Sequence, residues 1–471
     1  HYGTEWAYRV DGEARPPTVA SFHCVGGASV FYGGVTLRFR ERDFEPVPEI
    51  VADSGARWPF GYGELEPYYD EVERLLGVAG EAGSDPFEPH RSGPFPQRAG
   101  ALAPVSRRFE AAARGLGLRP FRLPLAINYG STGGRTACVA CGSCDGFACA
   151  VSAKNDLPTV VLAPLVRRGL RLETDTVATR LLAEGGQVTA VETVHRFSGE
   201  RRRFRAPQVF LAAGALASPH LLLASGLERL NPAGDTVGRY LMRHYNEIIL
   251  GIFPRRPNPD GGFHKQLGIH DYYFGDPAHP ELGPKLGALQ QLTTPPAGLV
   301  RAEVPGRLGR AAAKLVGHLT GWLTIAEDQP QFENRIRVEP GRSDRLGMPV
   351  AIITHRHSAR DYAAGAALGA RARRILGRAG AWAHYRHKVA TFSHGVGTVR
   401  MGTDPRRSAL DAECRFRGLD NLYVVDGSVM PTSAAVNPSL TIAANALRAA
   451  RRLLARAEQA PELRHRVATH D

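Results

Sequence analysis

The sequence predicts an α/β unit that is interrupted by an inserted α+β unit, and three observations support this prediction. An apolar run at 209–213 that is typical of a buried strand leads into a helix predicted at 218–223. Residues 236–390 then change in character, with Pro-bounded strand-like runs and one long helix rich in Ala, Gly and Arg. The C-terminal part returns to a short strand and a long helix, at 422–457. We therefore predict one domain from residues 1–235 and 391–471 and a second domain from 236–390.

The clearest single helix is predicted at 62–79. Its apolar residues recur at helical spacing, and acidic residues stand in its first half. These apolar residues are Leu65, Tyr68, Tyr69, Val72, Leu75 and Leu76. A second amphipathic helix is predicted near 105–116, inside a Pro- and Gly-rich stretch at 80–130.

After residue 156 the pattern alternates between strands and turns. Short runs predict strands at 171–174, 177–182 and 188–195, and a Gly185-Gly186 turn separates the last two. Further strands are predicted at 248–253, 322–326 and 422–425, and further helices near 359–378 and 440–457.

The composition excludes several classes of protein. The 471 residues are 43% hydrophobic and 22% charged, so the chain can bury a core and is neither disordered nor a coiled coil. The net charge is +13, but the basic residues are scattered and do not interleave with aromatic residues as a nucleic-acid surface requires. Six Cys are too few for a disulfide scaffold. The longest uncharged apolar run, 209–226, is broken by Gly, Pro and His, and the start of the chain shows no signal pattern. We therefore expect a cytoplasmic protein that has no membrane span and binds no nucleic acid.

Two Gly pairs stand close together near the N-terminus, in the segment CVGGASVFYGG at 24–34. Gly26-Gly27 and Gly33-Gly34 bracket small and aromatic residues. Because glycine lets the backbone approach a flat or phosphate-bearing ligand closely, the segment is a candidate cofactor contact. Taken alone, an ordinary Gly turn explains the pattern about as well.

A strand-to-helix junction stands at 209–219. The apolar strand ends in small residues at Ala213, and a helix begins just after it. A doubly wound sheet presents a strand end and a helix N-terminus to a dinucleotide in this way, so Ala213 is a candidate cofactor-binding residue. A plain buried junction is an equally good interpretation of this segment alone.

Three polar groups stand in the C-terminal part of the chain, each in a loop or at the end of an element. His394 lies in a Gly-rich loop, Asp426-Gly427 ends a strand, and Asn437-Pro438 opens a helix. Oxidation of an alcohol needs a group that takes the hydroxyl proton while hydride leaves the carbon. Neutral imidazole, with an ordinary pKa of about 6.5, suits that role. An Asn amide can hold the substrate oxygen without titrating, and an Asp can accept a hydrogen bond from a cofactor hydroxyl.

With these motifs the chain resembles the glucose–methanol–choline (GMC) family of flavoprotein oxidoreductases, from about residue 8 to residue 451. The resemblance is clearest at both ends and weakest across 236–390, and it includes Trp58-Pro59 followed by ELEPYY at 64–69. It implies a Rossmann-like FAD-binding domain and an α+β substrate domain. It also implies hydride transfer from a CH–OH donor to flavin N5, in an oxidase or in a dehydrogenase.

The resemblance also implies roles for individual residues. His394 matches the active-site His that acts as the catalytic base, and Asn437 matches the second member of the pair, which is His or Asn in different members. The residues that match flavin or adenine contacts are Gly26, Gly27, Tyr32, Gly33, Val177, Asp426, Gly427, Asn437 and Pro438.

The sequence departs from the family pattern at two points. The family's G-x-G-x-x-G is missing, because the nearest candidates, at 115–117 and 395–397, lack the third Gly and the strand–helix context. We therefore expect the chain to lack the N-terminal βαβ unit. Some members attach the flavin through a His in the Gly segment, where this chain has Phe31 and Tyr32. We therefore predict non-covalent FAD, and a structural role for His23 just before the segment.

Four cysteines cluster in one loop, and these are Cys138, Cys141, Cys144 and Cys149. Their spacing fits neither the usual iron–sulfur run nor the two separated pairs of a zinc site. Similar Cys-rich loops occur in bacterial members of the family, so we favour a structural loop over a metal site or a disulfide. We predict no metal site, and surface or pocket-wall positions for the histidines His355, His357, His384 and His387.

The leading hypothesis is FAD-dependent oxidation of a CH–OH group of an alcohol or sugar, with His394 as the base. One alternative is a truncated, non-catalytic fragment of such an enzyme, and a less favoured one is a metal-binding protein organised by the Cys cluster. The sequence leaves open the alcohol, the oligomeric state and the electron acceptor, which could be oxygen, a quinone or a dye-like molecule.

Overall fold

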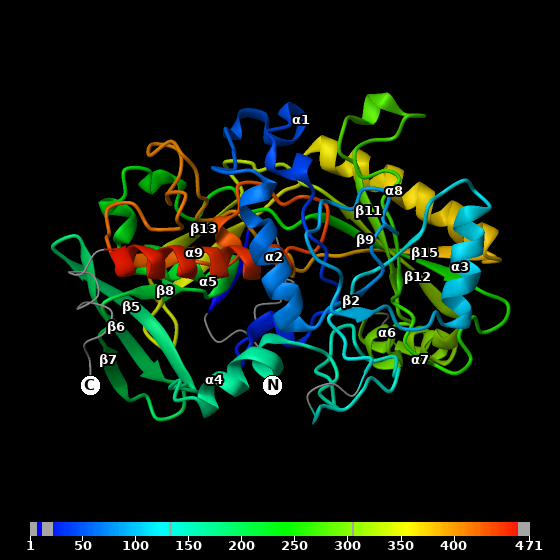
Figure 1. Cartoon of the computed structure of the whole chain (residues 1–471), viewed down its shortest axis with the longest axis horizontal. Helices are drawn as coiled ribbons and strands as arrows, with labels where there is room; N and C mark the ends of the chain where they lie inside the picture. Colours follow the sequence, from blue (N-terminus) through cyan, green and yellow to red (C-terminus); the bar gives the residue numbers. More distant parts are fainter. Residues whose placement is uncertain (1–6, 12–21, 131–133, 304–305, 460–471) are drawn as a thin grey trace.

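The structure is a computed structural model that describes residues 7–11, 22–130, 134–303 and 306–459. Its elements form two halves that lie side by side (Figure 1). One half holds three small sheets and the other holds a six-stranded sheet, and a fifth sheet among the described residues is the short parallel pair of β2 (Ala79–Gly80) and β3 (Gln97–Arg98).

The first half combines a parallel strand pair, a three-stranded meander and a third small sheet. The parallel pair consists of β8 (Val209–Leu211) and β16 (Leu422–Val424). The antiparallel meander consists of β5 (Thr176–Glu184), β6 (Gln187–His195) and β7 (Arg201–Phe204). In the third sheet, β14 (Pro349–Thr354) pairs in parallel with β1 (Tyr8–Val10) and antiparallel with β13 (Arg335–Ser343). Its main helices are α2 (Tyr62–Leu76), α5 (Gly214–Ala224) and α9 (Ser439–Gln459).

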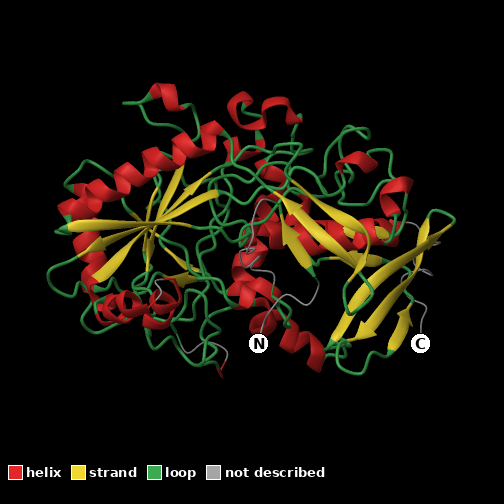
Figure 2. Ribbon diagram, turned by 180° about the vertical axis from the view of Figure 1, so that it is seen from behind, coloured by secondary structure: helices red, strands yellow, loops and turns green. Residues whose placement is uncertain are grey.

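The second half is one antiparallel sheet covered by a long helix. In order, its strands are β15 (Ala383–Lys388), β9 (Tyr245–Ile252), β12 (Leu319–Ala326), β11 (Gly287–Leu292), β10 (Leu267–Ile269) and β4 (Phe121–Arg122). Helix α8 (Ala359–Arg378) packs along the sheet, as Figure 2 shows, and α3 (Pro104–Arg114) packs beside it. Phe109 of α3 stacks on the buried Trp322 at a centroid distance of 5.7 Å. The predicted division into 1–235 with 391–471 and 236–390 stays a prediction.

The remaining helices and strands are short. They are α1 (Pro48–Val51), α4 (Ala163–Arg167), α6 (Ala297–Glu303), α7 (Gly306–Lys314), β2 (Ala79–Gly80) and β3 (Gln97–Arg98). No helix within the described ranges combines the length and the apolar character needed to cross a bilayer.

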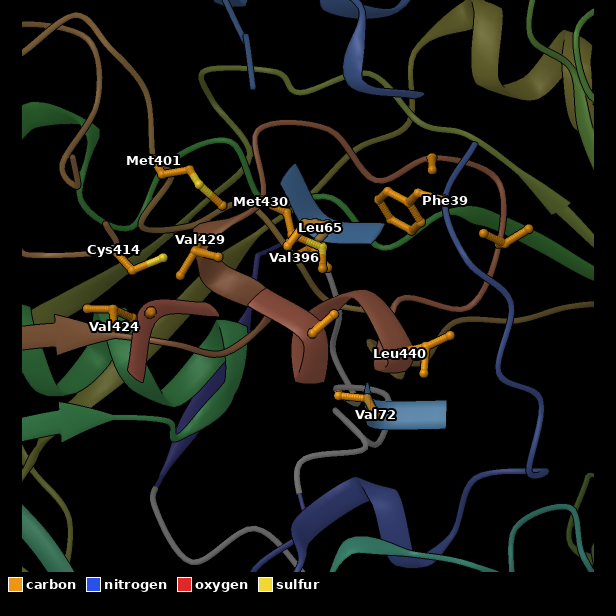
Figure 3. Packing of buried hydrophobic residues seen from close by; sticks show 14 of the residues in the cluster. Phe39, Leu65, Val72, Val396, Met401, Cys414, Val424, Val429, Met430 and Leu440 are labelled. Carbon is orange, nitrogen blue, oxygen red and sulfur yellow. The ribbon is translucent and has the colours of Figure 1, made fainter. Parts of the chain in front are cut away.

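The core of the first half immobilises two loops in the C-terminal part of the chain. Leu65 and Val72 of α2, Leu440 of α9 and the loop residues Val396 and Met430 belong to one buried cluster, in which Leu65 lies beside Val396 and Met430 (Figure 3). All five side chains are buried. A loop that is anchored in a close-packed core can hold a polar side chain in a fixed place.

Most predicted elements are present, with two differences. The helix predicted at 218–223 begins earlier, at Gly214, because Asp426 accepts hydrogen bonds from the Gly214 N–H and the Ser218 hydroxyl. The strand predicted at 171–174 is wrong, since these residues run outside the described sheets and part of them lines the cavity described below.

Candidate active site

The first half contains a cavity of about 880 Å³. Four parts of the chain line most of it: residues 22–28, 172–178, 211–217 and a C-terminal set that includes Ser393, Gly395, Asp426, Gly427 and Ile442. These parts are far apart in the sequence, so the fold has to assemble the cavity.

Six of the predicted cofactor residues line this cavity. They are Gly26, Gly27, Val177, Ala213, Asp426 and Gly427. Gly26 needs to be glycine for two reasons: its φ is +92°, and a Cβ there would lie 2.0 Å from Cγ of Pro158. His23, which we expected to be structural, also lines the cavity.

Asp426 lines the cavity and is hydrogen-bonded to the start of α5. Its Oδ2 accepts hydrogen bonds from the Gly214 N–H (2.9 Å) and from the Ser218 hydroxyl, and its Oδ1 accepts from the Ser428 N–H (2.8 Å). A carboxylate at a helix N-terminus is favourable because the first N–H groups of the helix have no intrahelical partner.

Tyr32, Gly33, Asn437 and Pro438 do not belong to the residues that line the cavity. The Tyr32 hydroxyl donates to the Asn155 carbonyl at 2.7 Å. A Cβ on Gly33 would lie 2.2 Å from Oδ1 of Asp145, which forms an ion pair with Lys265 at 2.7 Å. The Pro438 carbonyl accepts from the Ile442 N–H in the first turn of α9.

The structure brings His394 and Asn437 together. Nδ2 of Asn437 lies 3.3 Å from Nε2 of His394, and the neighbours of His394, Ser393 and Gly395, both line the cavity. The pair therefore stands at the edge of the cavity.

Two residues that the sequence did not single out form hydrogen bonds with this pair. Gln290 of β11 donates from Nε2 to Oδ1 of Asn437 at 2.6 Å. Nδ1 of His244, just before β9, lies 3.0 Å from Nδ1 of His394. Gln290 and its neighbour Gln291 are buried polar residues of β11, but this burial is visible only in the structure, so no sequence signal marked Gln290. No sequence signal marked His244 either.

The surroundings of His394 favour its neutral form. Burial lowers the pKa of its imidazole to about 3, and the nearby His244 and Lys265 act in the same direction, while Asp328 opposes them. A neutral imidazole keeps a lone pair on one nitrogen, and a general base needs such a lone pair.

The Cys-rich loop is tied to the Gly segment by a lysine. Nζ of Lys154 donates to the carbonyls of Tyr32 (2.8 Å), Cys144 (3.1 Å) and Phe147 (2.7 Å). The six cysteines are free thiols. The interpretation as a structural loop fits this bonding.

One group of possible metal ligands occurs among the described residues, away from the Cys loop, and it consists of Asp328, His355 and His357. Arg243 donates from Nε to Nδ1 of His355 at 3.3 Å. An imidazole that accepts at Nδ1 carries its proton on Nε2, which here faces Asp328 at 3.8 Å. A protonated nitrogen cannot coordinate a metal, so this arrangement disfavours a metal ion at His355.

Comparison with known proteins agrees with this geometry. Two family models described as GMC oxidoreductase match residues 15–246 and 330–446. The chain is 35% identical to 6'''-hydroxyparomomycin C oxidase of Streptomyces lividus, over 91% of this chain and 78% of the relative. It is 34% identical to paromamine 6'-oxidase of Streptomyces fradiae, over 91% of this chain and 77% of the relative.

Solved structures show the same fold at lower sequence identity. Pyridoxine 4-oxidase from Mesorbium loti matches with a TM-score of 0.62 and 21% identity, over 95% of this chain and 88% of that chain. Formate oxidase from Aspergillus oryzae matches with a TM-score of 0.63 and 14% identity, over 96% of this chain and 88% of that chain. The predicted fold class, an α/β flavin-binding domain with an α+β substrate domain, is confirmed.

The two family models match in order along this chain and together cover most of it, and two relatives share about a third of its residues. The protein therefore belongs to the GMC oxidoreductase family, whose members are flavoproteins.

Proposed function

We propose that the protein is an FAD-dependent oxidoreductase that oxidises a CH–OH group of an alcohol or sugar, with His394 as the base. The observation that carries this proposal is the contact between the His394 imidazole and the Asn437 amide at the edge of the cavity, and burial, which lowers the pKa of His394, supports it.

In the proposed reaction His394 and Asn437 both form hydrogen bonds with the substrate hydroxyl. A hydroxyl that enters between them donates its proton to Nε2 of His394, while an N–H of Asn437 holds the oxygen as negative charge develops on it. Bound FAD supplies the acceptor for the hydride that leaves the carbon. The products are a carbonyl compound, a protonated imidazole and the reduced cofactor.

The size of the cavity and several of its lining residues support a cofactor site. Its volume of about 880 Å³ falls within the range of pockets that enclose small molecules and cofactors. Gly26, Gly27, Val177 and Ala213 would hold FAD against exposed backbone, and the Asp426-Gly427 turn would lie beneath it.

We also propose that the FAD is non-covalent. Phe31 and Tyr32, in the Gly segment, carry no imidazole that could form the bond. His23 is a histidine that lines the cavity near this segment, so denaturation of the holoprotein tests the point directly. The flavin is expected to separate from the unfolded protein, and flavin that stays with the protein would contradict non-covalent binding.

The substrate class is suggested by the relatives. Paromamine and 6'''-hydroxyparomomycin C appear in the names of two relatives, so sugar hydroxyls of this kind should come first in a substrate screen. Oxygen, quinones and dyes remain the proposed electron acceptors, and the cytoplasmic location remains a prediction.

The test is flavin bleaching without oxygen. Holoprotein is mixed with a panel of sugars and aliphatic alcohols, and the loss of the oxidised flavin absorbance is followed. We expect bleaching by at least one alcohol and the matching aldehyde or ketone as product. A protein that binds FAD but is bleached by no alcohol in a broad panel would contradict the proposal.

A further inference from the structure

His394 shares a hydrogen bond with a second imidazole. Nδ1 of His394 and Nδ1 of His244 lie 3.0 Å apart, and the two rings meet at 82°. Between two neutral imidazoles such a bond needs one protonated and one bare nitrogen. The question is which of the two rings carries the proton.

The Ser433 carbonyl decides the direction of this bond. Nε2 of His244 lies 3.1 Å from that carbonyl oxygen, which can only accept a hydrogen bond. The proton of neutral His244 therefore sits on Nε2, and its Nδ1 is bare. His394 must then carry its proton on Nδ1, which leaves Nε2 bare and facing Asn437.

The other end of the chain of hydrogen bonds agrees with this direction. Asn437 turns its Nδ2 toward Nε2 of His394, and its Oδ1 accepts from Gln290. The side-chain amides of Asn437 and Gln290 could rotate and bond in the opposite direction, but the Ser433 carbonyl cannot become a donor. If the hydrogen bond between the two histidines ran in the opposite direction, the bare Nε2 of His244 would face the Ser433 oxygen.

Hydrogen bonds near Ser433 and the backbone conformation of His244 hold the His244–Ser433 contact in place. The Ser433 hydroxyl donates to Asp328 at 2.9 Å, and the next N–H, of Ala434, donates to Glu327 at 3.0 Å. His244 itself has a φ of +62°, which is uncommon for a residue with a side chain. Such conformations persist where the surrounding structure imposes them, and they cluster at functional sites.

We infer that His244 is a positioning residue that, with the Ser433 carbonyl, holds His394 in the tautomer whose Nε2 is free to take a proton. This inference rests on the proposed function, because it concerns the tautomer of the proposed base. The wrong tautomer presents an N–H where the base needs a lone pair.

The first test reads the tautomer without any turnover. Protein labelled with ¹⁵N-histidine gives long-range ¹H–¹⁵N spectra, and the His394→Gln variant identifies the signals of His394 among the 17 histidines. We expect a protonated Nδ1 and a bare Nε2 in the wild type. A protonated Nε2 in the wild type overturns the inference, whatever the variants do.

The second test varies the acceptor. His244→Leu removes it, whereas His244→Asn offers an amide oxygen close to the position of Nδ1. We expect His244→Leu to populate the other tautomer and to lower the rate of flavin reduction by about 100-fold, the lower end of what a positioned base contributes. His244→Asn is expected to retain the wild-type tautomer and most of the rate. Equal loss in both variants without a change of tautomer would show a merely structural role and overturn the inference.

A matched control lies at the far end of the same sheet. His318, just before β12, bonds through Nδ1 to the Phe253 carbonyl at 2.9 Å. We expect His318→Asn to change neither the tautomer of His394 nor the rate, and a change in that tautomer would contradict the specific role of His244. The two proposals fail separately: His394→Ala without effect removes the base, whereas an unchanged tautomer in His244→Leu removes only the positioning role.

Discussion

The nitrogen that is proposed to take the substrate proton, Nε2 of His394, belongs to an imidazole that its surroundings keep neutral. Burial removes the water that would stabilise a charged ring, and Lys265 and His244 add to the same effect. The pKa of about 3 lies far below the ordinary value of about 6.5. His394 is therefore in its basic form throughout the physiological range.

This shift predicts the acid side of the pH profile. The rate of flavin reduction should not fall through loss of the base as the pH is lowered from about 8 to about 5, since the folded pKa lies below that window. Stopped-flow reduction at saturating substrate measures it. A fall that titrates near 6.5 would mean that His394 behaves as an ordinary exposed imidazole.

At the scale of elements, the proposed site is built from turns and from the ends of elements. Asp426 follows β16 and caps α5, Asn437 precedes α9, and Gly26 begins a tight turn against Pro158. Residues at such points face a shared edge, where several segments meet around one cavity.

The Gly26 turn gives a test with a matched control. Gly26 and Gly83 both have positive φ, +92° and +75°, but a Cβ meets Pro158 only at Gly26 and open space at Gly83. Gly83→Ala should cost about 1–2 kcal/mol of unfolding free energy for the backbone alone. Gly26→Ala should cost about 1–3 kcal/mol more, because of the overlap with Pro158, and should weaken FAD binding.

Urea unfolding of both variants and a fluorescence titration with FAD measure these effects. Equal losses of stability, with unchanged FAD affinity in both variants, would show that the close approach at Gly26 has no importance for the cavity.

The sequence predicted the elements whose pattern is local. Helix α2 follows from apolar spacing, whereas α8 and α9 follow from stretches rich in Ala, Arg, and Gly or Leu. Helix α8 also has a capping box in which Ser358 and Asp361 bond each other's N–H groups. The early start of α5 was missed because it depends on Asp426, which lies far along the chain.

At the scale of the whole molecule, the proposed site joins the two halves. His394 and Asn437 belong to C-terminal loops, whereas Gln290 belongs to β11 and His244 precedes β9. Motifs predicted the first two. The latter two act through contacts between distant segments, and a single sequence does not contain that information.

Buried histidines also give the whole molecule a defined response to acid. Burial lowers the pKa of six of them, namely His220, His264, His270, His355, His357 and His394. Below about pH 6.5 these histidines bind protons in the unfolded chain but not in the folded protein. The free energy of unfolding therefore falls as the pH falls. Asp361 has the opposite sign, because its pKa is raised to about 7 and the folded carboxyl holds a proton there.

Burial also raises the pKa of Glu88, but the six histidines outnumber these two carboxyls, so the net effect of acid is destabilising. The free energy of unfolding should be lower at about pH 5 than at about pH 7 by at least about 2 kcal/mol, the contribution of one such histidine. Urea midpoints at the two pH values measure it, and a midpoint that rises in acid would contradict the account.

The most direct test of the central claim is stopped-flow reduction of the flavin in His394→Ala under anaerobic conditions, beside the wild type. The variant should retain its FAD and its fold, while reduction by the alcohol slows by about 100-fold or more because no group takes the hydroxyl proton. Reduction at the wild-type rate in a variant that still binds FAD would contradict the role of His394.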